Sequence, residues 1–152
     1  MIEEKLKELG IELPTPPNPA GSYIPVVTTG NLAFISGQIP MKEGKVVFEG
    51  KVPDKQSLDS ARDAAKICII NGLAQLKSNL GSLDRITKFV RISGFVNSSP
   101  EFTEQPKVIN AASDLLVEVF GDMAKHSRIA VGVASLPLNS TVEIDMVVEI
   151  ST

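Results

Sequence analysis

With 152 residues, of which 43% are hydrophobic and 22% charged, the chain has the size and composition of one globular domain, and these values exclude a disordered protein. The formal net charge is −3 and the 15 lysines and arginines are scattered, so the sequence lacks the basic patch of a nucleic-acid-binding protein. Cys68 is the single cysteine, which excludes a disulfide framework within the chain and favours a cytoplasmic protein, and every apolar run ends before the roughly 18 residues of a membrane span.

The N-terminal part of the chain predicts a short extension over residues 1–19, followed by three strands. Residues 1–9 read as an amphipathic helix, and the Pro-rich run that follows is an extended connector, because proline lacks the backbone N–H that a helix needs. Three β-type segments separated by glycine-containing turns are then expected at Tyr23–Thr28, Leu32–Ser36 and Lys45–Glu49. Their short connections predict an antiparallel meander.

The pattern changes to a helical period after Ser57. Apolar residues recur every three or four positions from Ser57 to Leu80, which predicts a long helix with one buried face. A second helix is predicted from Thr103–Pro106 to Phe120 on the same grounds. Further strands are expected at Ile86–Val96, Arg128–Ala134 and Thr141–Ile150.

The predicted order of elements, β-β-β-α-β-α-β-β, indicates a single α+β domain spanning residues 1–152. There are too few crossovers for a doubly wound sheet, so two helices should cover one face of a six-stranded antiparallel or mixed sheet. The other face is then left to water or to a neighbouring subunit.

Two of the expected strands carry charged residues in informative positions. Side chains alternate across a strand, so one face of the segment 128–134 holds an arginine and then only small residues, namely Arg128, Ala130, Gly132 and Ala134. Empty space beside the permanently charged guanidinium group, with its several N–H donors, suits a small anionic ligand. Alternatively, the small residues admit the backbone of another subunit, and Arg128 pairs with Glu143 or Asp145 of the last strand.

Several other residues are candidates for a site, each with a simpler alternative. Gly37, between two polar residues, could present backbone donors or form an ordinary turn. Tyr23 could offer its hydroxyl or its ring to a ligand, or pack against the fold. Cys68 fits the buried stripe of the first long helix, and His126, the sole histidine, is either a solvent-facing loop residue or a neighbour of the pocket. No cofactor motif or metal-ligand spacing is present, so we expect neither group.

Two segments of the sequence resemble the YjgF/RidA family, also called the endoribonuclease L-PSP family. They are residues 35–40 (ISGQIP) and residues 128–137 (RIAVGVASLP), the latter followed by 142–145 (VEID). The resemblance extends from about Ala20 to the C-terminus. It implies a chorismate-mutase-like α+β fold and a homotrimer whose sheets surround a central barrel, with three ligand clefts between the subunits.

The same resemblance implies a reaction and roles for individual residues. Arg128 would bind the carboxylate of a small 2-imino acid of the 2-aminoacrylate type, and Glu143 would position the water that hydrolyses it to a 2-keto acid and ammonia, without a cofactor. The residues that match the lining of the family's pocket are Tyr23, Ser36, Gly37, Asn110 and Ala130.

Three functions are compatible with this resemblance. The first is the deaminase, and the second is a protein that binds a small carboxylate without turning it over. Ala130, where the family often has cysteine, and an extra residue between Asn110 and Arg128 motivate the second. The long N-terminus and the run 108–121 look more like a divergent subgroup of the family. The third is an endoribonuclease or translation inhibitor, against which the acidic balance argues.

Overall fold

A computed structural model describes residues 1–16 and 21–152, so the expected Pro-rich connector lies partly outside the described residues. The helices are α1 (Ile2–Glu8), α2 (Leu58–Leu80) and α3 (Gln105–Phe120). The strands are β1 (Val26–Thr29), β2 (Leu32–Gln38), β3 (Met41–Lys42), β4 (Lys45–Val46), β5 (Ile86–Asn97), β6 (Ser127–Val133) and β7 (Val142–Ile150). In the part of the chain described, no helix is both long enough and apolar enough to cross a membrane.

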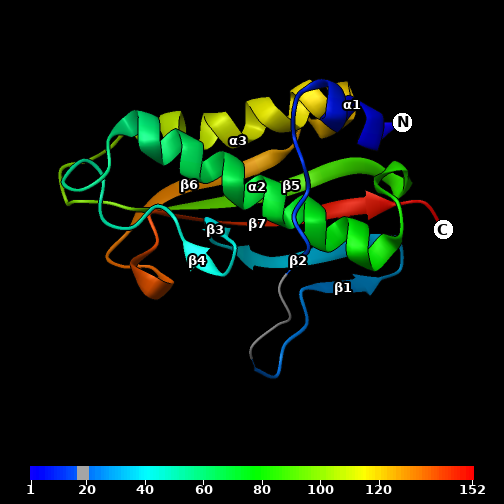
Figure 1. Ribbon diagram of the computed structural model, residues 1–152, viewed down its shortest axis with the longest axis horizontal. Coiled ribbons are helices and arrows are strands. Elements are labelled where there is room, and N and C mark those ends of the chain that lie inside the picture. The colour runs from blue at the N-terminus through cyan, green and yellow to red at the C-terminus, as the bar shows by residue number, and fades with distance from the viewer. Residues whose placement is uncertain (17–20) are drawn as a thin grey trace.

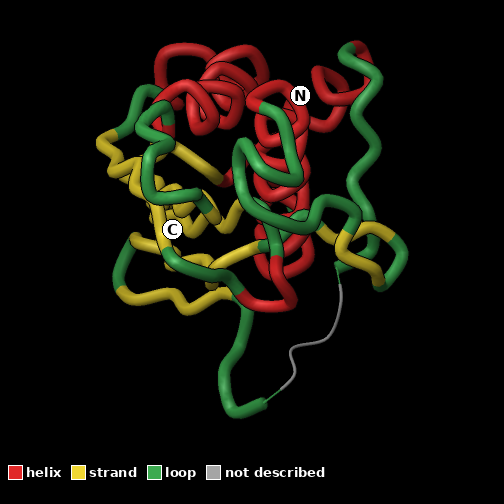
Figure 2. The backbone as a smooth tube through the Cα atoms, turned by 90° about the vertical axis from the view of Figure 1, so that its left-hand side faces the viewer, coloured by secondary structure: helices red, strands yellow, loops and turns green. Residues whose placement is uncertain are grey.

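The fold is α+β, with α2 and α3 side by side over one face of a mixed sheet (Figure 1). The main sheet has five strands in the order β1-β2-β7-β5-β6, in which β5 and β6 are parallel and the other neighbours antiparallel. Viewed from the side, the helices gather on one side of the strands, and among the described residues no helix covers the other face of the sheet (Figure 2). We call this uncovered surface the open face.

The prediction of a sixth strand in this sheet is wrong. Only β4 forms within the segment Lys45–Glu49, and it pairs with β3 in a separate two-stranded sheet. The reason is the tight turn between them, where Glu43 and Gly44 have φ values of 52° and 78° and fold the chain back on itself. The turn therefore closes a small hairpin before the chain could join the main sheet.

The helix α2 begins and ends where the sequence predicts. The side chain of Ser57 accepts a hydrogen bond from the Ser60 backbone N–H at 3.0 Å, and Gly81 ends the helix with φ of 86°. Cys68 lies in the core with 1% of its surface exposed and contacts the Val142 carbonyl. Burial raises the pKa of this thiol well above its ordinary value, so Cys68 is a packing residue.

The N-terminal extension is part of the packed structure as far as it is described. Leu6 of α1 is 2% exposed, and Leu9 and Ile11 pack against the same core as the sheet and the two long helices. The Ile2 backbone N–H donates to the Asp84 side chain at 3.0 Å. These contacts tie α1 to the turn that precedes β5.

The small-residue face of β6 lies under α3 and not on the open face of the sheet. Ile92 of β5 is level with both Arg128 and Met146, and all three point to the helix side. On the opposite side of β6, Ile129 and Val131 are 38% and 40% exposed. The small residues are therefore needed for the close approach of α3 to the sheet.

Replacing Gly94 by alanine is expected to lower the free energy of unfolding by about 1–3 kcal/mol, the usual cost of overpacking a core. Gly94 of β5 faces Ile109 of α3, and an added Cβ would lie 2.6 Å from the Ile109 Cδ1 and Cγ1 atoms. Urea denaturation of the two proteins checks this. A Gly30→Ala control meets no atom within 4 Å, although its φ of 58° adds some backbone strain, and an equal loss in the two variants would contradict the packing argument.

Candidate functional site

Arg128 lies on the helix side of β6, the edge strand of the sheet, and its guanidinium group is held by α3. Its Nη2 donates to the Asn110 Oδ1 at 2.8 Å and, at 3.4 Å, to the Pro106 carbonyl, while Nη1 donates to the Ser113 Oγ at 3.0 Å. Asn110 and Ser113 can both reach it because residues three apart share one face of a helix. The orientation of the guanidinium is therefore fixed by two side chains of α3.

The positive charge of Arg128 has no carboxylate partner among the described residues. The ion pairs there involve other groups, and the pairing of Arg128 with Glu143 or Asp145 considered from the sequence does not occur within one protomer. Asn110 is exposed and Arg128 only half buried, so both are accessible from solvent. Such a fixed cation with neutral neighbours is suited to an anionic ligand.

Ser113 and His126 extend the hydrogen bonding behind the arginine. His126 lies on the short segment before β6, with Nδ1 2.6 Å from the Ala124 carbonyl and Nε2 2.9 Å from the Ser113 Oγ. A carbonyl only accepts, so Nδ1 carries a proton, and in the neutral ring Nε2 then accepts from the Ser113 hydroxyl. His126 is thus linked to Arg128 through Ser113.

The environment of His126 favours the neutral ring. Burial lowers the pKa of His126 from its ordinary value, the hydrogen bond to Ala124 opposes this, and the positive charge of Arg128 lowers it further. Sequence reasoning did not single out Ser113. The signal was present in the spacing, because Ser113 is three residues from Asn110 on the same helix.

Glu143 lies on the open face of β7, next to the end of β2. The pairing of β2 with β7 shifts register between Ile35 and Gln38, so Ser36 and Gly37 form an irregular segment beside Glu143. A Cβ on Gly37 would lie 2.1 Å from the Glu143 Oε2, so a larger residue there would displace this carboxylate. Burial, and secondly the charge of Asp145, raise the pKa of Glu143 from its ordinary value.

Ser36 and Tyr23 lie on the β1 side of the same region. The Ser36 hydroxyl donates to the Ile24 carbonyl at 3.0 Å and its backbone N–H to the Pro25 carbonyl at 2.9 Å, so both donors are used inside the chain. Tyr23 is 56% exposed and does not pack into the core. Ser36 thus links the segment that carries Tyr23 to the bulge beside Glu143.

Within one protomer the predicted site residues form two separate groups. We call Arg128, Asn110 and Ala130 the arginine half-site, and Glu143, Gly37, Ser36 and Tyr23 the glutamate half-site. Glu143 is level with Phe95 of β5, which is level with Val131 of β6, and all three point to the open face. Arg128 points to the opposite face, so one chain does not bring Arg128 and Glu143 together.

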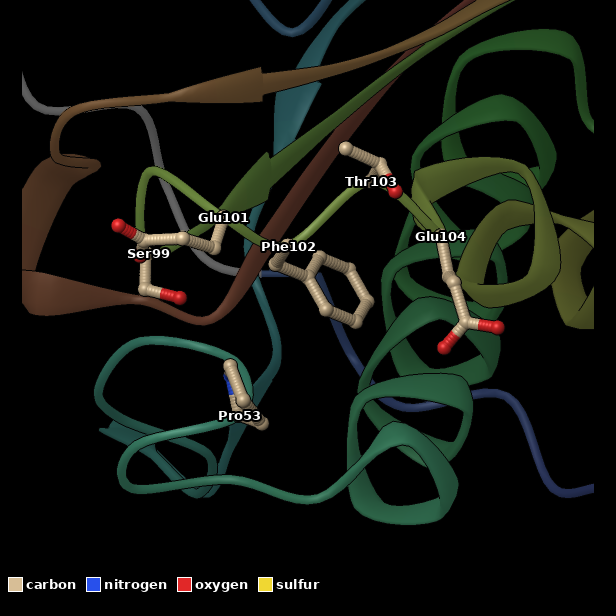
Figure 3. Close-up of a pocket in the computed structure, with 6 residues that line it drawn as sticks. All are labelled: Pro53, Ser99, Glu101, Phe102, Thr103 and Glu104. Atoms are coloured by element: carbon tan, nitrogen blue, oxygen red, sulfur yellow. The ribbon is translucent and has the colours of Figure 1, made fainter.

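Neither of two surface hollows contains these half-sites. One, of about 270 Å³, lies where the chain leaves β5 for α3, and the Phe102 ring occupies the middle of its lining (Figure 3). The residues that line it are Pro53, Ser99, Glu101, Phe102, Thr103 and Glu104. Its two carboxylates would repel an anion. A second hollow, of about 330 Å³, lies between α2 and α3 beside Leu9 and Ile11. Among the described residues no group of three or more His, Cys, Asp or Glu side chains could hold a metal ion.

Comparison with known proteins finds one family across almost the whole chain. The model of the family described as YjgF/chorismate mutase-like, putative endoribonuclease, matches residues 3–150. A crystal structure of the Agrobacterium tumefaciens protein Atu1372, described as having unknown function, is 48% identical with a TM-score of 0.92, covering 99% of this chain and 92% of that one.

Curated relatives also cover most of the chain. Protein TCP17 of Trypanosoma cruzi is 39% identical over 99% of this chain and 94% of its own length. A more distant relative from Dermatophagoides farinae is 28% identical over 92% of this chain and 94% of its own length, and it is named a 2-iminobutanoate/2-iminopropanoate deaminase.

Proposed function

This chain belongs to the YjgF/chorismate mutase-like, putative endoribonuclease family, and from that premise we propose that it is a cofactor-independent deaminase that hydrolyses small 2-imino acids to 2-keto acids and ammonia. The observation that carries the proposal is the guanidinium of Arg128, held by Asn110 and Ser113 and free of any described carboxylate. A relative named as a deaminase acting on such imines supports the choice of substrate.

The catalytic site is proposed to form between subunits of a homotrimer. In one protomer the two half-sites lie on different faces of the sheet, so a second protomer must supply the glutamate half-site to a ligand bound at Arg128. The open face carries exposed apolar side chains of the kind that subunit contacts cover, namely Val27, Phe34, Val90, Ile129 and Val131. The site is therefore incomplete without the partner copy.

The chemistry requires a carboxylate clamp and a positioned water. Arg128 binds the substrate carboxylate through two parallel N–H donors, which fixes the neighbouring C=N carbon. Glu143 of the other protomer accepts a proton from water as the oxygen attacks that carbon, and the proton is then returned to the nitrogen, which gives an amino alcohol. Glu143 next accepts the hydroxyl proton and passes it to the nitrogen as the C–N bond breaks, so ammonia leaves and the 2-keto acid remains.

The direct test is turnover by the wild-type protein. A dehydratase generates 2-aminoacrylate in situ, and the release of pyruvate and ammonia is followed with and without the protein. We expect the protein to accelerate the release above the spontaneous rate without any added cofactor. An unchanged rate across a range of protein concentrations would overturn the proposal.

The assembly has its own test. Wild-type protein is expected to give a light-scattering mass of about three times the 16.3 kDa of one chain. Val131→Asp should reduce that mass and the turnover together, because it places a charge on the open face, which the proposed subunit contacts cover. Leu138→Asp, at a position 66% exposed in a turn outside the sheet, is the matched control and should leave the mass unchanged. A monomeric wild type would contradict the shared site.

A second function is supported by the separation of the half-sites. The arginine half-site alone can bind a carboxylate, so the chain could capture a 2-keto acid without hydrolysing anything. Thermal stabilisation by 2-ketobutyrate in a protein that shows no imine hydrolysis would favour this binding function over the deaminase.

A further inference from the structure

Two hydrogen bonds connect the Arg128 guanidinium through Ser113 to a titratable ring behind it, and a third holds that ring on the backbone. Arg128 Nη1 lies 3.0 Å from the Ser113 Oγ, which lies 2.9 Å from His126 Nε2, and His126 Nδ1 lies 2.6 Å from the Ala124 carbonyl. Neither Ser113 nor His126 is part of the two half-sites. Both are half buried, and Ser113 contacts the Arg128 guanidinium directly.

The direction of the Ser113 hydroxyl depends on the charge of His126. With a neutral ring, Nε2 accepts a hydrogen bond from the Ser113 hydroxyl, so the Ser113 oxygen only accepts from Arg128. With a protonated ring, Nε2 donates to the Ser113 oxygen, and the Ser113 hydroxyl can donate its hydrogen bond to another acceptor. A carboxylate bound at Arg128 would offer the hydroxyl such an acceptor, because Arg128 Nη1 itself contacts the Ser113 Oγ.

We propose that Ser113 and His126 form a proton-linked extension of the Arg128 site, in which protonation of His126 turns the Ser113 hydroxyl toward the bound carboxylate and strengthens its binding. The inference rests on the proposed function only in requiring that Arg128 binds a carboxylate. It assigns Ser113 a contact with the ligand and His126 the role of a positioning residue that acts through Ser113.

The charges around His126 set the sign of this effect. Arg128 is the charged group that faces the ring from β6, while α3 presents the neutral Ser113 and the preceding turn presents the Ala124 carbonyl. The adjacent Lys125 pairs with Asp122 at 3.2 Å on the exposed side of that turn. A ligand carboxylate on Arg128 offsets the charge that lowers the His126 pKa, so binding should raise this pKa.

By linkage, a ligand that raises the His126 pKa binds more tightly when His126 is protonated. If the pKa rises by about half a unit to one unit on binding, the affinity should improve roughly three- to tenfold from pH 8 to pH 5. The gain should appear as the pH falls through the His126 titration and should level off below it.

His126 is the only histidine in the chain, so its ring signal in an NMR titration of histidine-labelled protein reports this group directly. The titration is run with and without saturating 2-ketobutyrate, and the Kd of 2-ketobutyrate is measured at pH 8 and pH 5. We expect the ligand to raise the pKa of His126, and the affinity to be higher at the lower pH. The probe stays ionised throughout this range.

Variants test whether the pH dependence of binding comes from Ser113 and His126 or from other groups. His126→Gln keeps an acceptor for Ser113 but cannot be charged, so its affinity should lose most of the pH dependence. Ser113→Ala should lose both the tighter binding at pH 5 and part of the ligand-induced pKa shift, and Ser113→Thr should restore them. Arg85→Ala should keep the His126 shift, because Arg85 lies in the turn before β5 and donates only to the Leu80 and Ser151 carbonyls.

The outcomes distinguish this inference from the proposed function. If 2-ketobutyrate binding needs Arg128 but leaves the His126 pKa unchanged, the proton-linked extension is overturned and the carboxylate site is not. Equal pH dependence in wild type and His126→Gln would do the same. A wild type that binds no 2-ketobutyrate at either pH would overturn both the proton-linked extension and the carboxylate site.

Discussion

Arg128→Ala is expected to lower kcat/KM for small 2-imino acids by roughly 30- to 1000-fold, equivalent to about 2–4 kcal/mol of lost binding in the transition state. The guanidinium supplies the charge and the paired donors for the substrate carboxylate, and alanine supplies neither. Arg128→Lys should recover little. A lysine has one charged nitrogen and cannot contact Asn110 and Ser113 while also binding both oxygens of a carboxylate. Steady-state kinetics on the three proteins measures the effect.

The matched control for this variant is Arg85→Ala. Arg85 is also a hydrogen-bonded arginine, donating to the Leu80 and Ser151 carbonyls, but it lies in the turn before β5, far along the strand from Arg128. Its loss should cost stability without changing kcat/KM of the folded protein. Full activity in Arg128→Ala, with a normal mass and circular dichroism spectrum, would remove the carboxylate clamp from the mechanism.

The periodicity of the sequence predicts the helices and most of the sheet, because each of these elements buries one face. The helix α2 follows from apolar residues at every third or fourth position between Ser57 and Gly81, and the alternation in β7 correctly places Val142, Ile144 and Met146 under the helices. The hairpin of β3 and β4 has too few residues to show such a pattern, so the sequence alone predicts a strand of the main sheet there.

The candidate site was only partly predictable, for a topological reason. Alternation divides β6 into two faces but does not say which one lies under α3, since Ile129 and Val131 are as apolar as core residues. The sequence also gives no strand order. Only the order β7-β5-β6 shows that Arg128 and Glu143 lie on different faces with a strand between them. That separation is what makes a second protomer necessary in the proposed function.

Glu143→Gln is the second variant expected to have a large effect, a fall in kcat of at least about 100-fold with a smaller change in KM. Glutamine keeps the shape and leaves Arg128 to bind the substrate, but it cannot accept a proton from water. The loss should not come from unfolding. Because folding raises the Glu143 pKa, the folded chain holds this proton more tightly, and the free energy of unfolding falls as pH rises through the raised pKa. An uncharged residue there should leave the neutral-pH stability unchanged or higher.

Asp145→Asn is the matched control, since Asp145 lies two residues along the same strand on the same face. It should retain turnover. Asp145 contributes to the raised pKa of Glu143, so its removal should also lower that pKa and move the acid limb of the kcat profile to lower pH. A base must be ionised to accept a proton, so activity should rise with pH through the Glu143 titration in both proteins. If the pH dependence of kcat is the same in wild type and Asp145→Asn, or if Glu143→Gln keeps the wild-type kcat, another group activates the water.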